Sequence, residues 1–213
     1  MTQPPDAHHH TGLSIERVAS RVVYDNPWMT LREDVIRRPD GSEGIYSYVE
    51  KPDFALIIPI EHGGVHLVEQ YRYPVGHRSW EFPQGTLPNR ESGDPLELAR
   101  RELAEETGLR ARRLHHLGNL HPAKGMGSQG FAVFVAEDLE VGEHAREHEE
   151  QDMRQRWVSR TEFEQMIRDG LVTDDSTLAA YLLLLLQPNP TSLANTCQHR
   201  HGANLATRHH NSH

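Results

Sequence analysis

The pattern of apolar and polar positions predicts β-structure over the first quarter of the chain. Segments 21–24, 29–37 and 43–50 are rich in β-branched and aromatic residues. They are separated by the turn sequences Asn26-Pro27 and Pro39-Asp40-Gly41. This spacing predicts three antiparallel strands that form a small N-terminal β-module.

The central part of the chain predicts the strands of a larger sheet. Residues 54–60 are almost all apolar, as expected for a strand covered on both faces, and the turn at 61–64 leads to a second strand at 65–71. The run HPAKGMGSQG at 121–130 predicts a long flexible loop that closes over a ligand or simply connects two strands. Further strands are expected at 114–120, 131–136 and 153–158.

Local signals define a short helix in the middle of the chain. Asp94 is suited to the N-cap, Pro95 to the first helical position and Glu97 to the third position after the cap, and Gly108 should end the helix. One face of this helix is apolar, which predicts that it packs on the sheet. The residues of that face are Leu96, Ala99 and Leu103.

Two more helices are predicted near the C-terminus. Thr161 and Glu164 form a capping box, so a helix should run from there to Arg168. The last helix should begin at Asp174 or Asp175 and continue to about residue 187. Its packing face is predicted to consist of Leu178, Leu182, Leu183 and Leu186.

Composition limits the class of protein. A chain of 213 residues can bury one good core, and its net charge of -9 argues against nucleic-acid binding through a basic surface. The single cysteine, Cys197, cannot form an internal disulfide, which favours the cytoplasm. The most apolar run, 179–186, is too short to span a membrane, and the N-terminus lacks the apolar segment of a signal peptide. Residues 1–15 and 188–213, both containing several histidines, are expected to be a disordered leader and tail.

The central helix carries an unusual group of carboxylates. Glu102, Glu105 and Glu106 are spaced i, i+3 and i+4, so they lie close together and repel one another. Arg101 can pair with Glu105, but one guanidinium cannot neutralise the whole group. Hard oxygen ligands without a neighbouring Cys or His suit Mg²⁺ or Mn²⁺. The alternative is a solvated acidic helix face.

The segment from Gly85 to Leu109 resembles the Nudix box. The family pattern is a Gly, five residues, a Glu, seven residues, and then Arg-Glu-apolar-x-Glu-Glu-x-Gly-apolar, whose second half is matched here at every fixed position. Between Glu91 and Arg101 stand nine residues instead of seven, which indicates a two-residue insertion in the loop before the helix. The resemblance implies structural roles for Gly85, Glu91, Arg101 and Gly108.

The resemblance also implies a fold and a domain arrangement. The expected fold is α/β: a Nudix α/β/α sandwich with a mixed sheet over residues 51–187, preceded by the antiparallel β-module at 16–50. Such a module resembles the extra sheet of the ADP-ribose and nucleotide-sugar pyrophosphatase branch. In that branch it implies a homodimer with a shared substrate site.

Residues before the box resemble the substrate-binding segments of ADP-sugar pyrophosphatases. The Arg-Tyr-Pro string places Arg72 near the substrate diphosphate, and Glu81 is expected to accept hydrogen bonds from a base. Trp80 either stacks on a purine or packs beside a strand. The carbonyl of Gln84 is a further candidate metal ligand, and Gln129 in the later loop is a candidate substrate contact.

The segment 137–152 is strongly acidic. It is either a solvated loop or, by resemblance to the ADP-ribose branch, the loop whose glutamate enters the site and activates water. Glu149 and Glu150 match that position best, and Asp152 is a weaker third candidate.

These residues predict a hydrolase that cleaves the diphosphate of a nucleoside diphosphate linked to another moiety. The resemblance implies ADP-ribose or another ADP-sugar as substrate, giving AMP and a sugar phosphate, with Mg²⁺ or Mn²⁺ as cofactor and Glu105 and Glu106 among the catalytic residues. One alternative is hydrolysis of a GDP-sugar, a dinucleoside polyphosphate or an oxidised nucleoside triphosphate. Another is a catalytically silent domain that senses a nucleotide sugar. Neither nucleic acid nor membrane is an expected partner.

Overall fold

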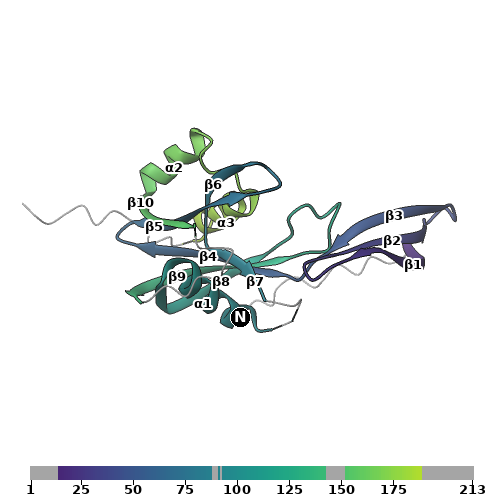
Figure 1. The fold of residues 1–213 in the computed structure, drawn as a ribbon, viewed down its shortest axis with the longest axis horizontal. Coiled ribbons are helices and arrows are strands. Elements are labelled where there is room, and N and C mark those ends of the chain that lie inside the picture. The colour runs from purple at the N-terminus through teal and green to yellow at the C-terminus, as the bar shows by residue number, and fades with distance from the viewer. Residues whose placement is uncertain (1–13, 88–90, 92, 143–151, 189–213) are drawn as a thin grey trace, which may run out of the picture.

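A computed structural model describes residues 14–87, 91, 93–142 and 152–188. Its first part is the expected antiparallel sheet of β1 (Glu16–Asp25), β2 (Thr30–Arg37) and β3 (Glu43–Glu50). This sheet projects sideways from the body of the molecule (Figure 1).

The body is built on a mixed sheet of seven strands in the order β10-β5-β4-β9-β8, with β6 paired to β5 and β7 paired to β4. The β4–β9 pair is parallel, whereas the other strand pairs of this sheet are antiparallel. The strands are β4 (Phe54–Glu61), β5 (Gly64–Arg72), β6 (His77–Glu81), β7 (Gln84–Thr86), β8 (Leu109–Leu120), β9 (Phe131–Val141) and β10 (Arg154–Ser159).

Helices cover both faces of this sheet, as the α/β/α prediction requires. Helix α1 (Pro95–Thr107) lies on one face, and α2 (Arg160–Arg168) and α3 (Asp175–Leu185) lie on the other (Figure 1). Alternate residues of β4 supply the two cores, because successive side chains of a strand point to opposite faces. Ala55 and Ile57 pack with Leu98, Ala99 and Leu103 of α1. The core on the side of α2 and α3 contains Leu56, Ile58, Phe82, Phe163, Tyr181 and Leu184, among others.

The caps of α1 confirm its predicted bounds. The Asp94 side chain accepts a hydrogen bond from the Leu96 N–H, Pro95 is the first helical residue, and Gly108 ends the helix at φ 69°. A side chain is disfavoured in this left-handed conformation, which explains the glycine.

The other two helices differ from the prediction in detail. Ser159, and not Thr161, caps α2, accepting a hydrogen bond of 3.2 Å from the N–H of Glu162. The predicted leucine face of α3 is confirmed only in part. Leu178 and Leu183 pack against the core, whereas Leu182 and Leu186 are 55% and 70% exposed. The buried residues of this helix are Ser176, Thr177, Ala180, Tyr181 and Leu184.

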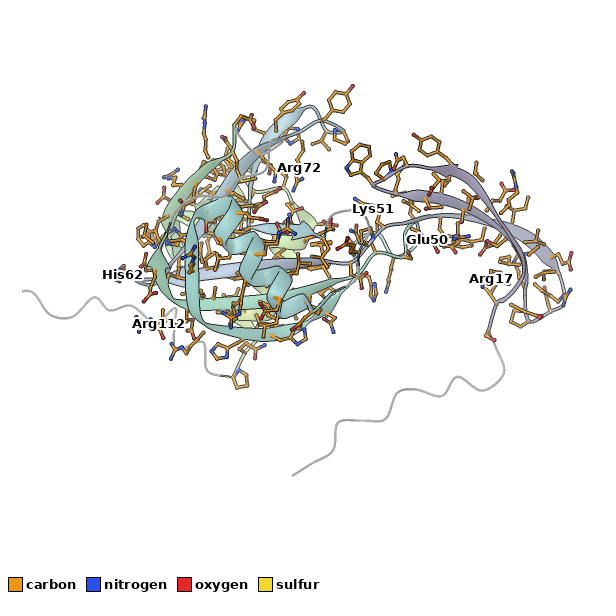
Figure 2. All side chains as sticks on the ribbon, turned by 60° about the horizontal axis from the view of Figure 1, so that its bottom comes forward. Arg17, Glu50, Lys51, His62, Arg72 and Arg112 are labelled. Carbon is orange, nitrogen blue, oxygen red and sulfur yellow. The ribbon has the colours of Figure 1, made fainter. Side chains whose placement is uncertain are left out.

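The projecting sheet is fastened to the body through the 121–130 loop. The N–H of Val49 donates to the carbonyl of Met126 at 2.9 Å, and the Val49 carbonyl accepts from Ser128 at 3.0 Å. The Tyr46 hydroxyl donates to the carbonyl of Gly125 at 2.8 Å. Glu50 and Lys51 lie at the narrow connection between the sheet and the body (Figure 2). The loop is therefore part of the connection between the two sheets.

No helix in the described ranges is long and apolar enough to cross a membrane.

Candidate active site

Helix α1 presents its glutamates to the segment that leads into it. Glu102 and Glu106 are only 4% and 2% exposed. The N–H of Gln84, in β7, donates to Glu106 Oε2 at 3.0 Å. Glu105 is more accessible and accepts from Arg101 Nε at 2.9 and 3.0 Å. Arg101 thus holds one carboxylate of the cluster, and its structural role in the box stays a prediction.

Gly85 allows the Glu102 carboxylate to lie against the backbone of β7. A Cβ atom built on Gly85 would lie 2.5 Å from Glu102 Cδ, closer than real side chains approach. The glycine of the box is therefore required by the position of a glutamate seventeen residues later. The backbone φ of Gly85 is not positive, so the close approach of Glu102, and not the backbone conformation, explains why a glycine is found here.

The donor set suits a hard divalent cation. In the described part of the chain, no three His, Cys, Asp or Glu side chains are already gathered closely enough to hold an ion. Mg²⁺ does not need such a cage, because it keeps several waters and binds through one or two carboxylates plus substrate phosphates. Two buried glutamates beside a third, accessible one meet that requirement.

Glu81 and Arg72 form a second polar group on the same side of the sheet as α1. Glu81 is 1% exposed and accepts from Gln70 Nε2 at 2.6 Å and from Arg72 Nε at 3.3 Å. Burial raises the pKa of Glu81, although the charge of Arg72 acts in the opposite direction. The Arg72 side chain itself stays 42% exposed. Glu81 therefore fixes a guanidinium that remains accessible to an anion (Figure 2).

Other candidates have structural contacts. Trp80 packs against the core beneath α2 and α3, which favours the packing interpretation of this residue. Gln129 Nε2 donates to the Pro52 carbonyl at 2.6 Å and so ties the loop to the connection between the sheets. Glu91 is exposed and lines an open cavity of about 570 Å³ near the start of α1. Its role in the box stays a prediction.

Glu149 and Glu150 lie outside the described residues, but the end of their segment is visible. Asp152 accepts from Arg78 Nη1 at 2.6 Å, and its main-chain carbonyl accepts from Nη2 at 2.9 Å. Arg78 also binds Glu69 on β5. Asp152 is thus an anchor for the start of β10, and Arg78, which the sequence did not single out, is the residue that holds it.

A helix with buried and accessible carboxylates packs in an α/β/α sandwich against a short strand that bears a glycine. This arrangement is typical of hydrolases of the Nudix class. Residues 50–181 match the family model described as the NUDIX domain. The chain belongs to the Nudix family. Residues 15–49 match a second model, described as the nucleoside diphosphate sugar hydrolase N-terminal domain, which corresponds to the projecting sheet.

Several named relatives are similar to the chain over most of its length. An ADP-ribose pyrophosphatase of Mycobacterium tuberculosis is 32% identical over 82% of this chain and 88% of its own length. A CMP-5'-(N-acetyl-N-hydroxy-3-aminopropyl)phosphonate hydrolase of Streptomyces rubellomurinus is 29% identical over 78% of this chain and 79% of its own. A crystal structure described as an ADP compounds hydrolase superposes with a TM-score of 0.75 at 19% identity, covering 88% of this chain and all of that one. The last match shows the fold. Together the matches show that the chain is an enzyme of the Nudix hydrolase class. Nudix hydrolases generally use divalent metal ions.

Proposed function

We propose that this enzyme hydrolyses ADP-ribose or another ADP-sugar to AMP and a sugar phosphate, using Mg²⁺ or Mn²⁺. The observation that carries the proposal is the presence, in one chain, of an intact box helix and of the nucleoside diphosphate sugar hydrolase N-terminal sheet. The similarity to the ADP-ribose pyrophosphatase of M. tuberculosis covers 82% of this chain, which is more than the Nudix domain alone.

The glutamates of α1 would hold the metal. When bound, a divalent ion neutralises diphosphate charge and lowers the pKa of a coordinated water. Glu102 and Glu106 supply the buried oxygens, and Glu105, oriented by Arg101, supplies the accessible one. The Gln84 carbonyl remains a proposed additional ligand. We also propose that Glu149 or Glu150 orients or deprotonates the attacking water.

Arg72 would bind the substrate diphosphate. Its guanidinium is fixed by the buried Glu81 yet is partly exposed, so little side-chain freedom is lost when a phosphate binds. Glu81 in turn either contacts the base, as the resemblance implies, or acts only by holding Arg72.

A nucleotide panel tests the substrate. With Mg²⁺ or Mn²⁺, ADP-ribose should release AMP, detected by chromatography, with a higher kcat/KM than CDP- or GDP-linked compounds, dinucleoside polyphosphates or oxidised nucleoside triphosphates. Slow ADP-ribose turnover beside rapid turnover of another nucleotide would contradict the proposed substrate and leave the family assignment intact.

A substitution of Arg72 tests its role as a phosphate ligand. Arg72→Ala should raise the KM for ADP-ribose about 10-fold or more, because one charge-assisted phosphate contact is lost. Arg112 lies on the opposite side of the body from Arg72 (Figure 2), so Arg112→Ala should leave this KM unchanged.

We further propose that the chain is a homodimer formed through the projecting sheet. Many large apolar side chains of this sheet are exposed, and exposed apolar side chains that gather in one part of a folded protein commonly mark an interface. Its exposed apolar residues are Ile15, Val18, Val22, Val23, Tyr24, Trp28, Val35, Ile45 and Tyr46.

A charged substitution on this surface tests the dimer. Ile45 is 67% exposed in the single chain, so Ile45→Asp should not disturb folding of the monomer. At an interface it would bury an unpaired charge, and light scattering should show a change from dimer to monomer. Val141→Asp, at a site 90% exposed on the body, is the matched control and should stay dimeric. A wild-type monomer, or an unchanged Ile45→Asp dimer, would contradict the proposal.

A further inference from the structure

The segment that leads into the box is held from outside by the connection between α2 and α3. Residues 79–84 contain the end of β6, a proline and the first residue of the three-residue strand β7, so ladder hydrogen bonds alone secure this segment poorly. Five contacts from residues 171–177 hold it along its length, one of them a 3.4 Å hydrogen bond from the Thr173 N–H to Ser79 Oγ. The other four are Trp80 N to Leu171 O at 3.1 Å, Ser79 Oγ to Thr173 Oγ1 at 3.2 Å, Phe82 N to Thr177 Oγ1 at 2.9 Å and Gln84 Nε2 to Asp174 Oδ2 at 3.2 Å.

Asp174 has two tasks in this arrangement. It is the N-cap of α3, where Oδ2 accepts from the Thr177 N–H at 2.8 Å. The same oxygen accepts from the side-chain amide of Gln84. A cap needs only the first of these contacts. The second reaches across to the segment that bears the box glycine.

Gln84 passes this constraint to helix α1. Its side chain is held by Asp174, and its main-chain N–H donates to Glu106 Oε2 at 3.0 Å. Glu106 is 2% exposed, so this N–H helps to fix the direction in which the buried carboxylate points. Asp174, Gln84 and Glu106 therefore form a continuous hydrogen-bonded path from the start of one helix to the carboxylates of another.

We infer that Asp174 is a positioning residue for the candidate metal site, acting through Gln84 to orient the Glu106 carboxylate. This inference rests on the metal-binding part of the proposed function and is independent of which nucleotide is the substrate. Groups that orient a metal ligand typically change metal affinity or activity 10- to 100-fold when they are removed. Asp174 belongs to this class, although it touches neither metal nor substrate in the inferred arrangement.

Two substitutions remove the contact from opposite ends. Asp174→Ser keeps an N-cap for α3, because serine caps as well as aspartate, but its shorter side chain does not reach Gln84. Gln84→Met keeps the main-chain N–H and a similar volume but removes the side-chain donor. Asp174→Asn retains an acceptor oxygen and serves as the conservative rescue. Asp175→Ser is the matched control, since Asp175 is an exposed neighbour on the same helix.

Mn²⁺ titration followed by electron paramagnetic resonance, without substrate, gives the primary readout. Asp174→Ser and Gln84→Met should each raise the Kd for Mn²⁺ about 10-fold. The double variant should show no further loss, because both changes interrupt one path. Asp174→Asn and Asp175→Ser should bind as the wild type does. The kcat with ADP-ribose should fall in the same order, with KM little changed.

Each alternative outcome has a distinct meaning. Asp174 also lies near enough to Glu81 for its charge to raise the pKa of Glu81. If Asp174→Ser weakened Mn²⁺ binding and Gln84→Met did not, Asp174 would act through Glu81 and the inference would be overturned. Wild-type Mn²⁺ affinity in both single variants, additive losses in the double variant, or no Mn²⁺ binding by the wild type would also overturn it. Weakened Mn²⁺ binding in an enzyme that does not cleave ADP-ribose would support the inference while contradicting the proposed substrate.

Discussion

Glu106→Gln should lower kcat at least 100-fold, roughly 2.7 kcal/mol of transition-state stabilisation, and leave the fold intact. The glutamine amide keeps a carbonyl oxygen that can accept from the Gln84 N–H, so the contact between β7 and α1 survives. What is lost is the negative charge that a hard cation requires of its ligand. Initial rates with a nucleotide substrate and Mg²⁺, together with thermal unfolding, measure the two effects separately.

A carboxylate elsewhere on α1 provides the control for this experiment. Glu97 lies on the same helix with a side chain 70% exposed and pairs only loosely with Arg100, at 3.6 Å. Glu97→Gln should keep full activity. Equal activity of Glu106→Gln and the wild type would show that the metal assignment is wrong and that the buried carboxylate only packs α1 against β7.

The central helix could be predicted from the sequence because its determinants are local. Asp94, Pro95 and Gly108 act within one turn of the helix ends, so residues that are neighbours in the sequence determine where the helix begins and ends. Helix α3 shows the limit of this reasoning. Residues 182–186 are all leucine, so no periodicity distinguishes one face, and the position of the sheet decides that Leu184 is buried while Leu182 is exposed.

The short strands and several site residues depend on contacts that sequence spacing does not reveal. Strand β7 has three residues and exists because β4 offers it a partner. Arg78 binds Asp152 across 74 positions, and Gln84 binds Asp174 across 90. Asp174 has an ordinary local explanation as the N-cap of α3, and Arg78 and Gln84 are polar residues of short strands, so no neighbouring residue points to these partners. The glutamates of α1 drew attention because their mutual repulsion is itself local, but the metal site was favoured over a solvated helix face only by the resemblance of the whole segment to the Nudix box.

The glycine of the box provides the second large expected effect. Gly85→Ala should reduce kcat/KM about 100-fold while changing the free energy of unfolding by only about 1–2 kcal/mol. The backbone at this position has no positive φ, so alanine is acceptable to the main chain itself. The added methyl group meets the end of the Glu102 side chain, at 2.5 Å from Cδ, and a side chain moves more easily than a strand. We therefore expect the Glu102 carboxylate to move away from its present position, which disrupts the metal site while the fold remains intact.

Gly125→Ala is the matched control, because nothing lies within 4 Å of a Cβ at that glycine and its carbonyl still accepts from Tyr46. This variant should retain wild-type kcat/KM and Mn²⁺ affinity. Gly85→Ala should instead lose Mn²⁺ affinity in parallel with kcat/KM, because one displaced carboxylate accounts for both. A Gly85→Ala enzyme that is as active as the wild type would mean that Glu102 is not needed where it now lies. If Gly85→Ala were less stable but the folded variant bound Mn²⁺ as the wild type does, the glycine would serve the packing of β7 on α1. The metal site would then depend on Glu105 and Glu106 alone.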